Sequence, residues 1–503
     1  MFKNIQKYLL INHPILWNTK VVPAIVILLV INLTFFLLGL AEGKLDFNET
    51  QNDYNYGIDG TVIFFSVLIS IVFIVVWLVY YLKNNSFKSF YPKSNFSLFK
   101  EWMILFSICF LTTLFSLSFY LGKDVRIRSY YSEEEAKKRC EILSMGSYFV
   151  DGSYSNNQYR NYAEAKTVEA VVDTAAADTH ITFNNRKYSY FSLMNKNLNS
   201  FTFFDYKTDS IREHKIKLWL VNQQKDSIKK VFKDYLAIAK EHNLKSNIDE
   251  NKWFDLINDY PDFENHKLIG ADNDGYAYHI ANYQNTAFDS VNKYLKVISK
   301  DLTMEYYKYY VPENRLNYNY DKISDSWTNP TFRFETLLIS LYFGLALSLL
   351  IFSFRVTSGR NWLIAVISLG VINIVFGIIA AISREDLVYP TLLFLIGLLA
   401  VIYFFLTLSR KKSKNISAIF LNSMLWILPA MLPIVFFMIQ EILQDMARND
   451  IYSSEYTKNP YYLMAEQMDD FTPIFFYLNL VFMILMMLLL SFKIKKWRGL
   501  AEG

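Results

Sequence analysis

The sequence has few cysteines and histidines and none of the short motifs that mark nucleotide or metal chemistry. Its two cysteines are Cys109, inside an apolar run, and Cys140, in a polar stretch, so a disulfide would have to join a membrane-embedded thiol to one well outside. The six histidines lack metal-ligand spacing, and there is no glycine-rich phosphate loop. We therefore expect no disulfide, metal, cofactor or catalytic centre, and no ATPase within this chain.

Charged residues are also scarce. Only 19% of the 503 residues are charged, whereas 52% are hydrophobic and 17% aromatic, which is far more apolar than a soluble globular protein. The net charge of +4 is small, and no basic run interleaved with aromatic residues indicates a nucleic-acid surface. The composition predicts a polytopic α-helical membrane protein whose partners include membrane lipids and no nucleic acid.

Eight apolar runs are long enough to cross a bilayer. A helix of about 20 residues, rising about 1.5 Å per residue, spans a hydrocarbon core of about 30 Å. The expected spans group into three within residues 21–122 and five within residues 334–493; they are Val21–Leu40, Val62–Leu82, Trp102–Leu121, Glu335–Phe354, Trp362–Ile382, Thr391–Leu408, Ala418–Gln440 and Ile474–Phe492.

Basic and acidic residues alternate between successive short loops, which indicates orientation because cytoplasmic loops are rich in Lys and Arg. The basic loops and tail contain Lys83, Lys88, Lys93, Lys100, Arg355, Arg360, Arg410, Lys411, Lys412, Lys414, Lys493, Lys495, Lys496 and Arg498. The intervening loops, 41–61 and 441–473, are predominantly acidic. The pattern predicts two cytoplasmic termini, a basic cytoplasmic tail at residues 494–503, and insertion in the cytoplasmic (inner) membrane of a bacterium.

Residues 123–333 are too polar for a bilayer and predict a helix-rich α+β extracytoplasmic domain between spans three and four. Ser132 and Glu135 form a capping box that predicts a helix over Glu133–Met145, with Gly146 as its C-terminal cap. Short strands are expected at Ile181–Phe183 and Ser200–Tyr206, and further helices at Ala163–Ala177, Ile211–Val221, Ser227–Lys240, Asp249–Asn258 and Ala287–Tyr307.

Polar groups within the spans are nearly limited to asparagine. Asn32, Asn373, Asn422 and Asn479 are expected to make interhelical hydrogen bonds rather than a substrate site. The lack of intramembrane acids argues against a proton-coupled secondary carrier. In the seventh span, two prolines, Pro429 and Pro433, are expected to bend the helix and free backbone carbonyls.

Two patterns outside the spans have simpler explanations than ligand binding. The stretch Asp272–Gly275 has two spaced carboxylates but lacks the remaining ligands of a calcium loop, so it is expected to be a polar turn. Cys140 follows three basic residues, 137–139, yet a partly buried cysteine is the simpler expectation than a reactive thiol.

The first 20 residues predict an amphipathic helix on the cytoplasmic surface, because Lys3, Lys7 and Lys20 alternate with apolar residues. Its end, His13–Lys20, places Pro14, Trp17 and a cation before the first span. Together with the basic loops and the large insert, Met1–Lys20 resembles the elbow region of ABC exporter membrane subunits, particularly type-2 permeases.

This resemblance implies a permease that is driven by a separate ATP-binding subunit through a short coupling helix. The basic loops Lys83–Glu101 and Arg410–Asn415 are then candidates for contact with that ATPase. The better candidate for the coupling helix is Phe96–Lys100, with Phe96, Leu98, Phe99 and Lys100 as contact residues.

Two other classes of function are open at this stage. One is a non-transporting membrane scaffold or sensor that meets an extracytoplasmic protein partner through residues 123–333, although eight spans are more than an anchor requires. The other is a lipid-linked glycosyltransferase or ligase, for which charged residues near the membrane are available at Glu335, Arg384, Glu385 and Asp386.

Overall fold

The computed structural model divides the chain into two compact units. It describes residues 2–48, 56–84, 96–150, 180–183, 186–189, 198, 201–258, 269–271, 309–331, 333–383, 387–409, 414–448 and 459–498. The spanning unit comprises Met1–Leu37, Asp59–Tyr120 and Phe332–Gly503, and the insert unit comprises Leu38–Ile58 and Leu121–Thr331.

Long apolar helices make up the spanning unit. The chain enters through α1 (Phe2–Asn12) and α2 (Pro14–Thr19), which are separated at His13, and Pro14 occupies the first turn of α2, where its missing N–H costs nothing. The helices that follow are α3 (Val21–Glu42), α4 (Tyr56–Asn84), α5 (Ser97–Thr113), α6 (Phe115–Arg128), α13 (Phe334–Val356), α14 (Gly359–Ser383), α15 (Val388–Ser409), α16 (Lys414–Arg448) and α17 (Pro460–Arg498).

Among the described residues, seven helices are long and apolar enough to cross a membrane: α3, α4 and α13 to α17. The third span predicted at Trp102–Leu121 is not one straight helix, because α5 and α6 meet there at a bend of 50°. Thr112 and Thr113 lie at the break, and their hydroxyls bond to the carbonyls of Cys109 and Phe110 three residues earlier, which disturbs the helix. The bundle thus has seven candidate spans, or eight if the bent pair is one span.

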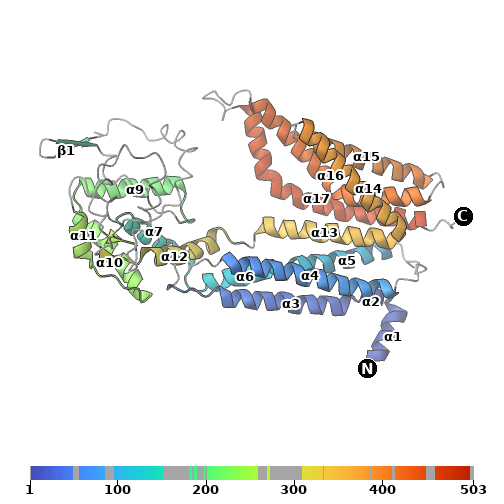
Figure 1. Cartoon of the computed structure of the whole chain (residues 1–503), viewed down its shortest axis with the longest axis horizontal. Coiled ribbons are helices and arrows are strands. Elements are labelled where there is room, and N and C mark those ends of the chain that lie inside the picture. Colours follow the sequence, from blue (N-terminus) through green and yellow to red (C-terminus); the bar gives the residue numbers. More distant parts are fainter. Residues whose placement is uncertain are drawn as a thin grey trace, which may run out of the picture. The chain divides into compact units, whose positions relative to one another are not determined.

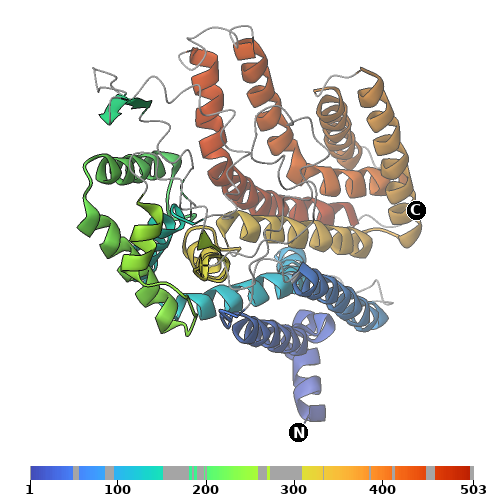
Figure 2. The ribbon, with the colours of Figure 1, turned by 60° about the vertical axis from the view of Figure 1, so that its left-hand side comes forward.

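Helix α13 lies at the centre of the spanning unit. It runs alongside α5 and also packs against α16 and α17, while α14 and α15 pack together with α16 (Figures 1 and 2). Gly344 permits the close approach of α13 to α5, because a Cβ at this position would lie 2.7 Å from the Cα of Phe110. Small residues at such crossings are how helices associate in lipid, where both surfaces are equally apolar.

The prolines of the seventh span lie inside one continuous helix, so α16 is not broken at Pro429 or Pro433. The expected free carbonyl is present nevertheless. Pro433 has no N–H with which to bond the carbonyl of Pro429, four residues earlier, and Asn479 Nδ2 of α17 donates to that oxygen at 2.9 Å. A side chain from a neighbouring helix thus satisfies a backbone group that water cannot reach.

Where it is described, the insert unit is built mainly from helices, with two small sheets. Its helices are α7 (Glu133–Ser147), α9 (Tyr206–Val221), α10 (Lys225–Glu241), α11 (Glu250–Ile257) and α12 (Glu313–Thr328). Strands β1 (His180–Phe183) and β2 (Arg186–Ser189) pair antiparallel, with His180 opposite Ser189, and β3 (Ile269–Gly270) pairs parallel with β4 (Tyr309–Tyr310).

The core of the insert unit joins residues from every described helix. It includes a stacked pair, Phe232 and Trp253, with ring centroids 4.2 Å apart, and Tyr235 packs edge-on to the same indole. A Cβ on Gly146 would lie 2.3 Å from the Tyr235 ring. This explains why the predicted C-terminal cap at Gly146 is wrong: the residue lies inside α7, where it makes room for an aromatic ring, and the helix ends one residue later.

Other predictions for the insert have mixed outcomes. The capping box is partly present, since Ser132 Oγ accepts a hydrogen bond from the Glu135 amide, and a strand at 181–183 is confirmed. The strand expected at Ser200–Tyr206 is wrong, because Asp205 instead caps α9 by accepting from the Thr208 amide. The elements expected at Ala163–Ala177 and Ala287–Tyr307, and the polar turn at Asp272–Gly275, lie outside the described residues.

A short segment after the first span also belongs to the insert unit. Leu45 lies in the unit's core, and its amide is bonded by the Tyr130 hydroxyl, which accepts at 3.3 Å. Phe47 stacks on the imidazole of His242 with ring centroids 3.6 Å apart. The sequence predicts only an acidic connection between two spans here, whereas the described segment packs as part of the insert unit.

Candidate functional site

The predicted contact residues form the beginning of α5 rather than a separate short helix. Phe96 caps the helix, is 51% exposed and packs edge-on against Phe492 of α17. Leu98 is buried, Phe99 is partly buried and Lys100 is exposed. The exposed members of this group, Phe96 and Lys100, are available to a partner, while Leu98 anchors the turn in the bundle.

The next residue of α5 carries a buried charge. Glu101 is 8% exposed and pairs with Arg355 of α13, itself 7% exposed, with 3.2 Å between Oε1 and Nε. The Tyr81 hydroxyl of α4 donates to the same carboxylate oxygen at 2.7 Å. Three helices are therefore joined at one carboxylate, and Tyr81, Glu101 and Arg355 are named here the polar cluster.

This ion pair was missed at the sequence level because both residues were assigned to basic loops. The structure extends α5 upstream to Ser97 and α13 downstream to Val356, so both charges lie on helices. Ionisable groups packed among membrane helices are rare and usually functional. The signal that could have found them is a single acid and a single base, each within one helical turn of an apolar run.

The polar cluster is connected to the N-terminal elbow through aromatic residues of α4. Trp77 stacks on Tyr81, with centroids 5.4 Å apart, and its indole N–H donates to the Thr19 carbonyl of α2 at 2.9 Å. Thr19 and Tyr81 are both fully buried. The end of the elbow is thus held to α4 within one turn of the helix from the polar cluster.

Arg355, the α13 member of the polar cluster, lies at the C-terminal end of that helix. Hydrogen bonds from neighbouring helices fix this end in place. Two indoles donate to it: Trp362 of α14 to the Leu350 carbonyl and Trp426 of α16 to the Ser353 hydroxyl. Thr357 Oγ1, just past the helix, donates to Asn422 Oδ1 of α16 at 3.2 Å. Arg355 lies in the last turn, where a cation is favoured by the helix dipole.

Chemically, this arrangement links helices and does not resemble a catalytic centre. The Glu101 carboxylate accepts hydrogen bonds from the Tyr81 hydroxyl and from the Arg355 guanidinium. It is therefore neither a free base nor an exposed nucleophile. A buried pair of this kind fixes the relative positions of its helices, because separating the partners would leave an uncompensated buried charge.

Intramembrane asparagines make the interhelical bonds expected of them. Asn373 of α14 accepts from the Tyr389 hydroxyl of α15 at 2.7 Å, and Asn479 of α17 donates to the Tyr342 hydroxyl of α13 at 2.6 Å. Asn422 bonds to Thr357, as described above. Asn32 bonds across the break between α5 and α6. The structural interpretation of these four residues is confirmed.

A second group of ionisable residues lies in the insert unit. Arg139 of α7 forms ion pairs with Glu135, at 2.6 Å, and with Glu241 of α10, at 2.8 Å. Its Nη1 also donates to the Tyr320 hydroxyl of α12 at 3.3 Å, and that hydroxyl lies 3.1 Å from His242 Nε2. This group ties three helices of the insert unit to the Phe47 segment, and it is called the His242 group below.

Burial sets the protonation states in the insert unit. It lowers the pKa of His242 to about 4 and raises the pKa of Tyr320 far above its ordinary value, so at neutral pH a neutral imidazole lies beside a protonated phenol. Burial also raises the pKa of the Cys140 thiol, whose side chain is fully buried. The expectation of an inert buried cysteine is confirmed, and both cysteines are free.

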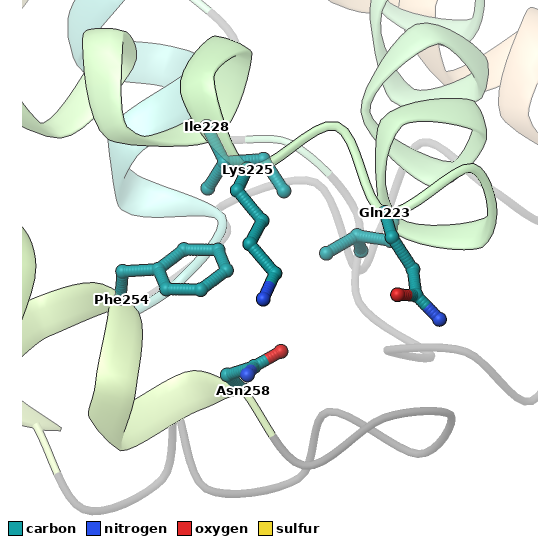
Figure 3. A pocket seen from close by; sticks show the side chains of 6 residues that line it. Gln223, Lys225, Ile228, Phe254 and Asn258 are labelled. Carbon is teal, nitrogen blue, oxygen red and sulfur yellow. The ribbon is translucent and has the colours of Figure 1, made fainter.

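The described residues contain a small pocket that is too small for a substrate. It lies among Leu220, Gln223, Lys225, Ile228, Phe254 and Asn258 of the insert unit (Figure 3), with a volume of about 10 Å³. Such a volume holds about one water molecule. Within the same described residues there is no group of three or more His, Cys, Asp or Glu side chains placed to hold a metal.

The residues considered for a glycosyltransferase or ligase do not form a described site. Glu335 lies in the first turn of α13, where an acid is favoured by the helix dipole, and Arg384–Asp386 lie outside the described residues.

The fold and the packed apolar helices define a polytopic helical membrane protein. Comparisons with protein-family models, with curated proteins and with solved structures gave no match.

Proposed function

We propose that this chain is the permease subunit of an ABC-type transporter, driven by a separate ATP-binding subunit. The observation that carries the proposal is the position of Glu101. It directly follows the exposed Lys100, lies five residues after the exposed Phe96, and is paired with Arg355 of the central helix α13. A force applied to the first turn of α5 would therefore reach α13 through a buried ion pair, which is the mechanical connection that an external ATPase requires.

The elbow supports the same function. Helices α1 and α2 precede the first span, and α1 exposes Tyr8, Leu10 and Ile11 as well as Lys7. The end of α2 is bonded to α4 through Thr19 and Trp77, next to the polar cluster. A surface helix and the proposed ATPase contact are thus joined to the same set of spans.

The proposed topology has eight spans, with the bent pair α5–α6 as the third. Loop charge supports this count. If α5 and α6 formed a re-entrant pair, the chain would leave the membrane on the face at which it entered. The basic residues at 355–360, 410–414 and 493–498 would then all face away from the cytoplasm. With the pair as a span, every basic loop and both termini are cytoplasmic, and the insert unit is extracytoplasmic in a bacterial inner membrane.

This topology can be tested with single cysteines and a membrane-impermeant thiol reagent on intact cells. Lys44→Cys and Lys229→Cys should be modified from outside, because Lys44 and α10 belong to the insert unit. Lys100→Cys and Arg360→Cys should react only after the membrane is permeabilised. The buried native Cys109 and Cys140 should give no background. Modification of position 229 only after permeabilisation would contradict the proposed topology and leave seven spans.

The function itself is tested by purifying the tagged protein in mild detergent and assaying ATPase activity. We expect a stoichiometric ATP-binding subunit whose turnover depends on this chain. Reversing the exposed charge with Lys100→Glu should reduce recovery of that subunit about tenfold or more, since like charges across an interface cost several kcal/mol. Lys44→Glu, the same change on the opposite proposed side, should have no effect.

Two outcomes would favour other functions. Recovery of this chain with extracytoplasmic proteins and no ATPase would favour the scaffold or sensor. Recovery of the chain alone, with glycosyl or ligase activity that depends on Glu335, would favour the enzyme. Either result would make the polar cluster a purely structural feature of the bundle.

A further inference from the structure

The break between α5 and α6 is held by side chains from neighbouring helices. In a continuous helix, the carbonyls of Leu111 and Thr112 would accept from the amides four residues later, in the first turn of α6. Instead, Leu111 O accepts from Asn32 Nδ2 of α3 at 3.1 Å. The Ser70 hydroxyl of α4 lies 2.8 Å from Thr112 O and 2.7 Å from the Ser66 carbonyl of its own helix, and it can donate to either oxygen. The carbonyls of Leu111 and Thr112 thus each have a side-chain donor within hydrogen-bond distance.

Asn32 also contacts α6, the helix that follows the break. Its Oδ1 accepts from the Ser118 hydroxyl of α6 at 2.7 Å, while its Nδ2 donates to the Leu111 carbonyl of α5. One side chain of α3 thus bridges the two helices at the bend. Because unsatisfied backbone groups are costly in lipid, this bridge stabilises the bent form directly.

A third side chain at the break is shared between two acceptors. The Thr113 hydroxyl lies 2.7 Å from the Phe110 carbonyl of its own helix and 3.1 Å from the Ser340 carbonyl of α13. A hydroxyl has one proton to donate, so it can bond one of these oxygens at a time. The local bonding at the bend therefore has two arrangements of nearly equal geometry.

We infer that the α5–α6 break is a two-state joint in which Asn32 latches the bent state. In the straightened state the carbonyls of Leu111 and Thr112 return to the backbone ladder and release Asn32 and Ser70. Backbone amides then replace the side-chain donors at these two carbonyls, while Asn32 Nδ2 and Ser70 Oγ keep the carbonyls of Leu28 and Ser66 in their own helices as acceptors. This inference does not depend on the proposed transport function.

Electron–electron distance measurements on the full-length protein can test the joint. One spin label replaces Val125, which is 43% exposed and lies ten residues into α6. Its distance is measured to a second label at Val79 of α4 and, in a separate protein, to a second label at Phe343 of α13. Over ten residues the arm is about 15 Å long, and removing the 50° bend moves its end by about 12 Å. The protein without added cysteines should take up no label, since Cys109 and Cys140 are buried.

Asn32→Ala is expected to move a large share of the distance distribution by several ångströms in at least one of the two measurements. Asn373→Ala is the matched control, because it removes an intramembrane asparagine that bonds α14 to α15 away from the break. Ser70→Ala, which frees only the Thr112 carbonyl, should give a smaller shift of the same sign. It also provides the test if Asn32→Ala fails to fold. Folded variants at both positions with the parent distribution would overturn the inference and show that packing alone fixes the bend.

Discussion

Replacing Arg355 with methionine is expected to lower the free energy of unfolding by roughly 3–5 kcal/mol, the usual cost of leaving a buried charge without its partner. Glu101 would retain the hydrogen bond from Tyr81 but would lose the guanidinium 3.2 Å away. Methionine keeps most of the side-chain volume, so the effect reports the charge rather than a cavity. Thermal and denaturant unfolding of the detergent-solubilised protein would measure it.

The partner variant and a matched control distinguish the ion pair from general damage. Glu101→Gln combined with Arg355→Met should recover much of the lost stability, because no unpaired charge is left. Arg360→Met makes the same chemical change at an exposed position of α14 and should cost less than about 0.5 kcal/mol. Equal losses for Arg355→Met and Arg360→Met, or no recovery in the double variant, would show that the pair does not hold α5 to α13.

A functional readout can be added to the same variants. If the polar cluster transmits force from the first turn of α5, the double variant should remain folded and bind the ATP-binding subunit while losing most of the activity that depends on this chain. Full activity in a stable double variant would limit the cluster to a structural role.

The membrane helices could be predicted because one physical requirement dominates them. A hydrocarbon core demands long apolar runs with internally satisfied backbones, so the seven candidate spans follow directly from the sequence. The asparagines could be predicted for a related reason, since an amide in lipid needs a partner. The bonds of Asn373 and Asn479 confirm this expectation.

The features that the sequence did not reveal all depend on which helices become neighbours. Glu101 and Arg355 are 254 residues apart, and nothing local distinguishes them from ordinary flanking charges until α5 packs on α13. Gly146 has the residue type of a helix cap, but its role is set by Tyr235 of another helix. The bend at Leu114 lies inside an apolar run, where hydropathy is uninformative.

Helix α12 was missed for a different reason. Its sequence is rich in Asn, Asp and Ser, which have low helix propensity, so composition alone gives this helix little support. The apolar spacing of Leu316, Tyr320 and Ile323, at intervals of four and three residues, was the available signal. Tertiary burial of that face outweighs the weak propensity of the remaining residues.

Acid is expected to loosen the insert unit through His242. Folding lowers the pKa of this imidazole from its ordinary value of 6.5 to about 4, because the ring is buried against Phe47 and faces the hydroxyls of Tyr320 and Tyr131, with Arg139 beside it. Above pH 6.5 the ring is neutral in both folded and unfolded chains, so it has no effect on stability. As the pH falls from 6.5 to about 4, only the unfolded chain gains the proton. The insert unit then loses up to roughly 2 kcal/mol, less than the full pKa shift would give, because the ring is only partly buried and solvent screens it.

Below that range a second group acts in the same direction. The hydrogen bond from Arg139 holds the pKa of Glu241 below its ordinary value of 4.5, so stability from this pair is present above that pH and is lost as the carboxylate is protonated. The two losses occur in sequence. The loss through His242 begins as the pH falls below 6.5, and the loss through Glu241 begins below 4.5.

Hydrogen exchange of the full-length protein, measured by mass spectrometry between pH 7 and pH 4 and corrected for the intrinsic rate, can resolve this effect by segment. Protection of α10, α12 and the segment around Phe47 should fall with pH, while α16 of the spanning unit should keep its protection. His242→Phe preserves a ring beside Phe47 but cannot be protonated, so it should abolish the pH dependence above about pH 4.5. His214→Gln, at an exposed position of α9, should leave it intact. Unchanged protection of α10 down to pH 4.5 in the parent protein would mean that His242 is not buried as a neutral ring, and that another contact holds Phe47 to the insert unit.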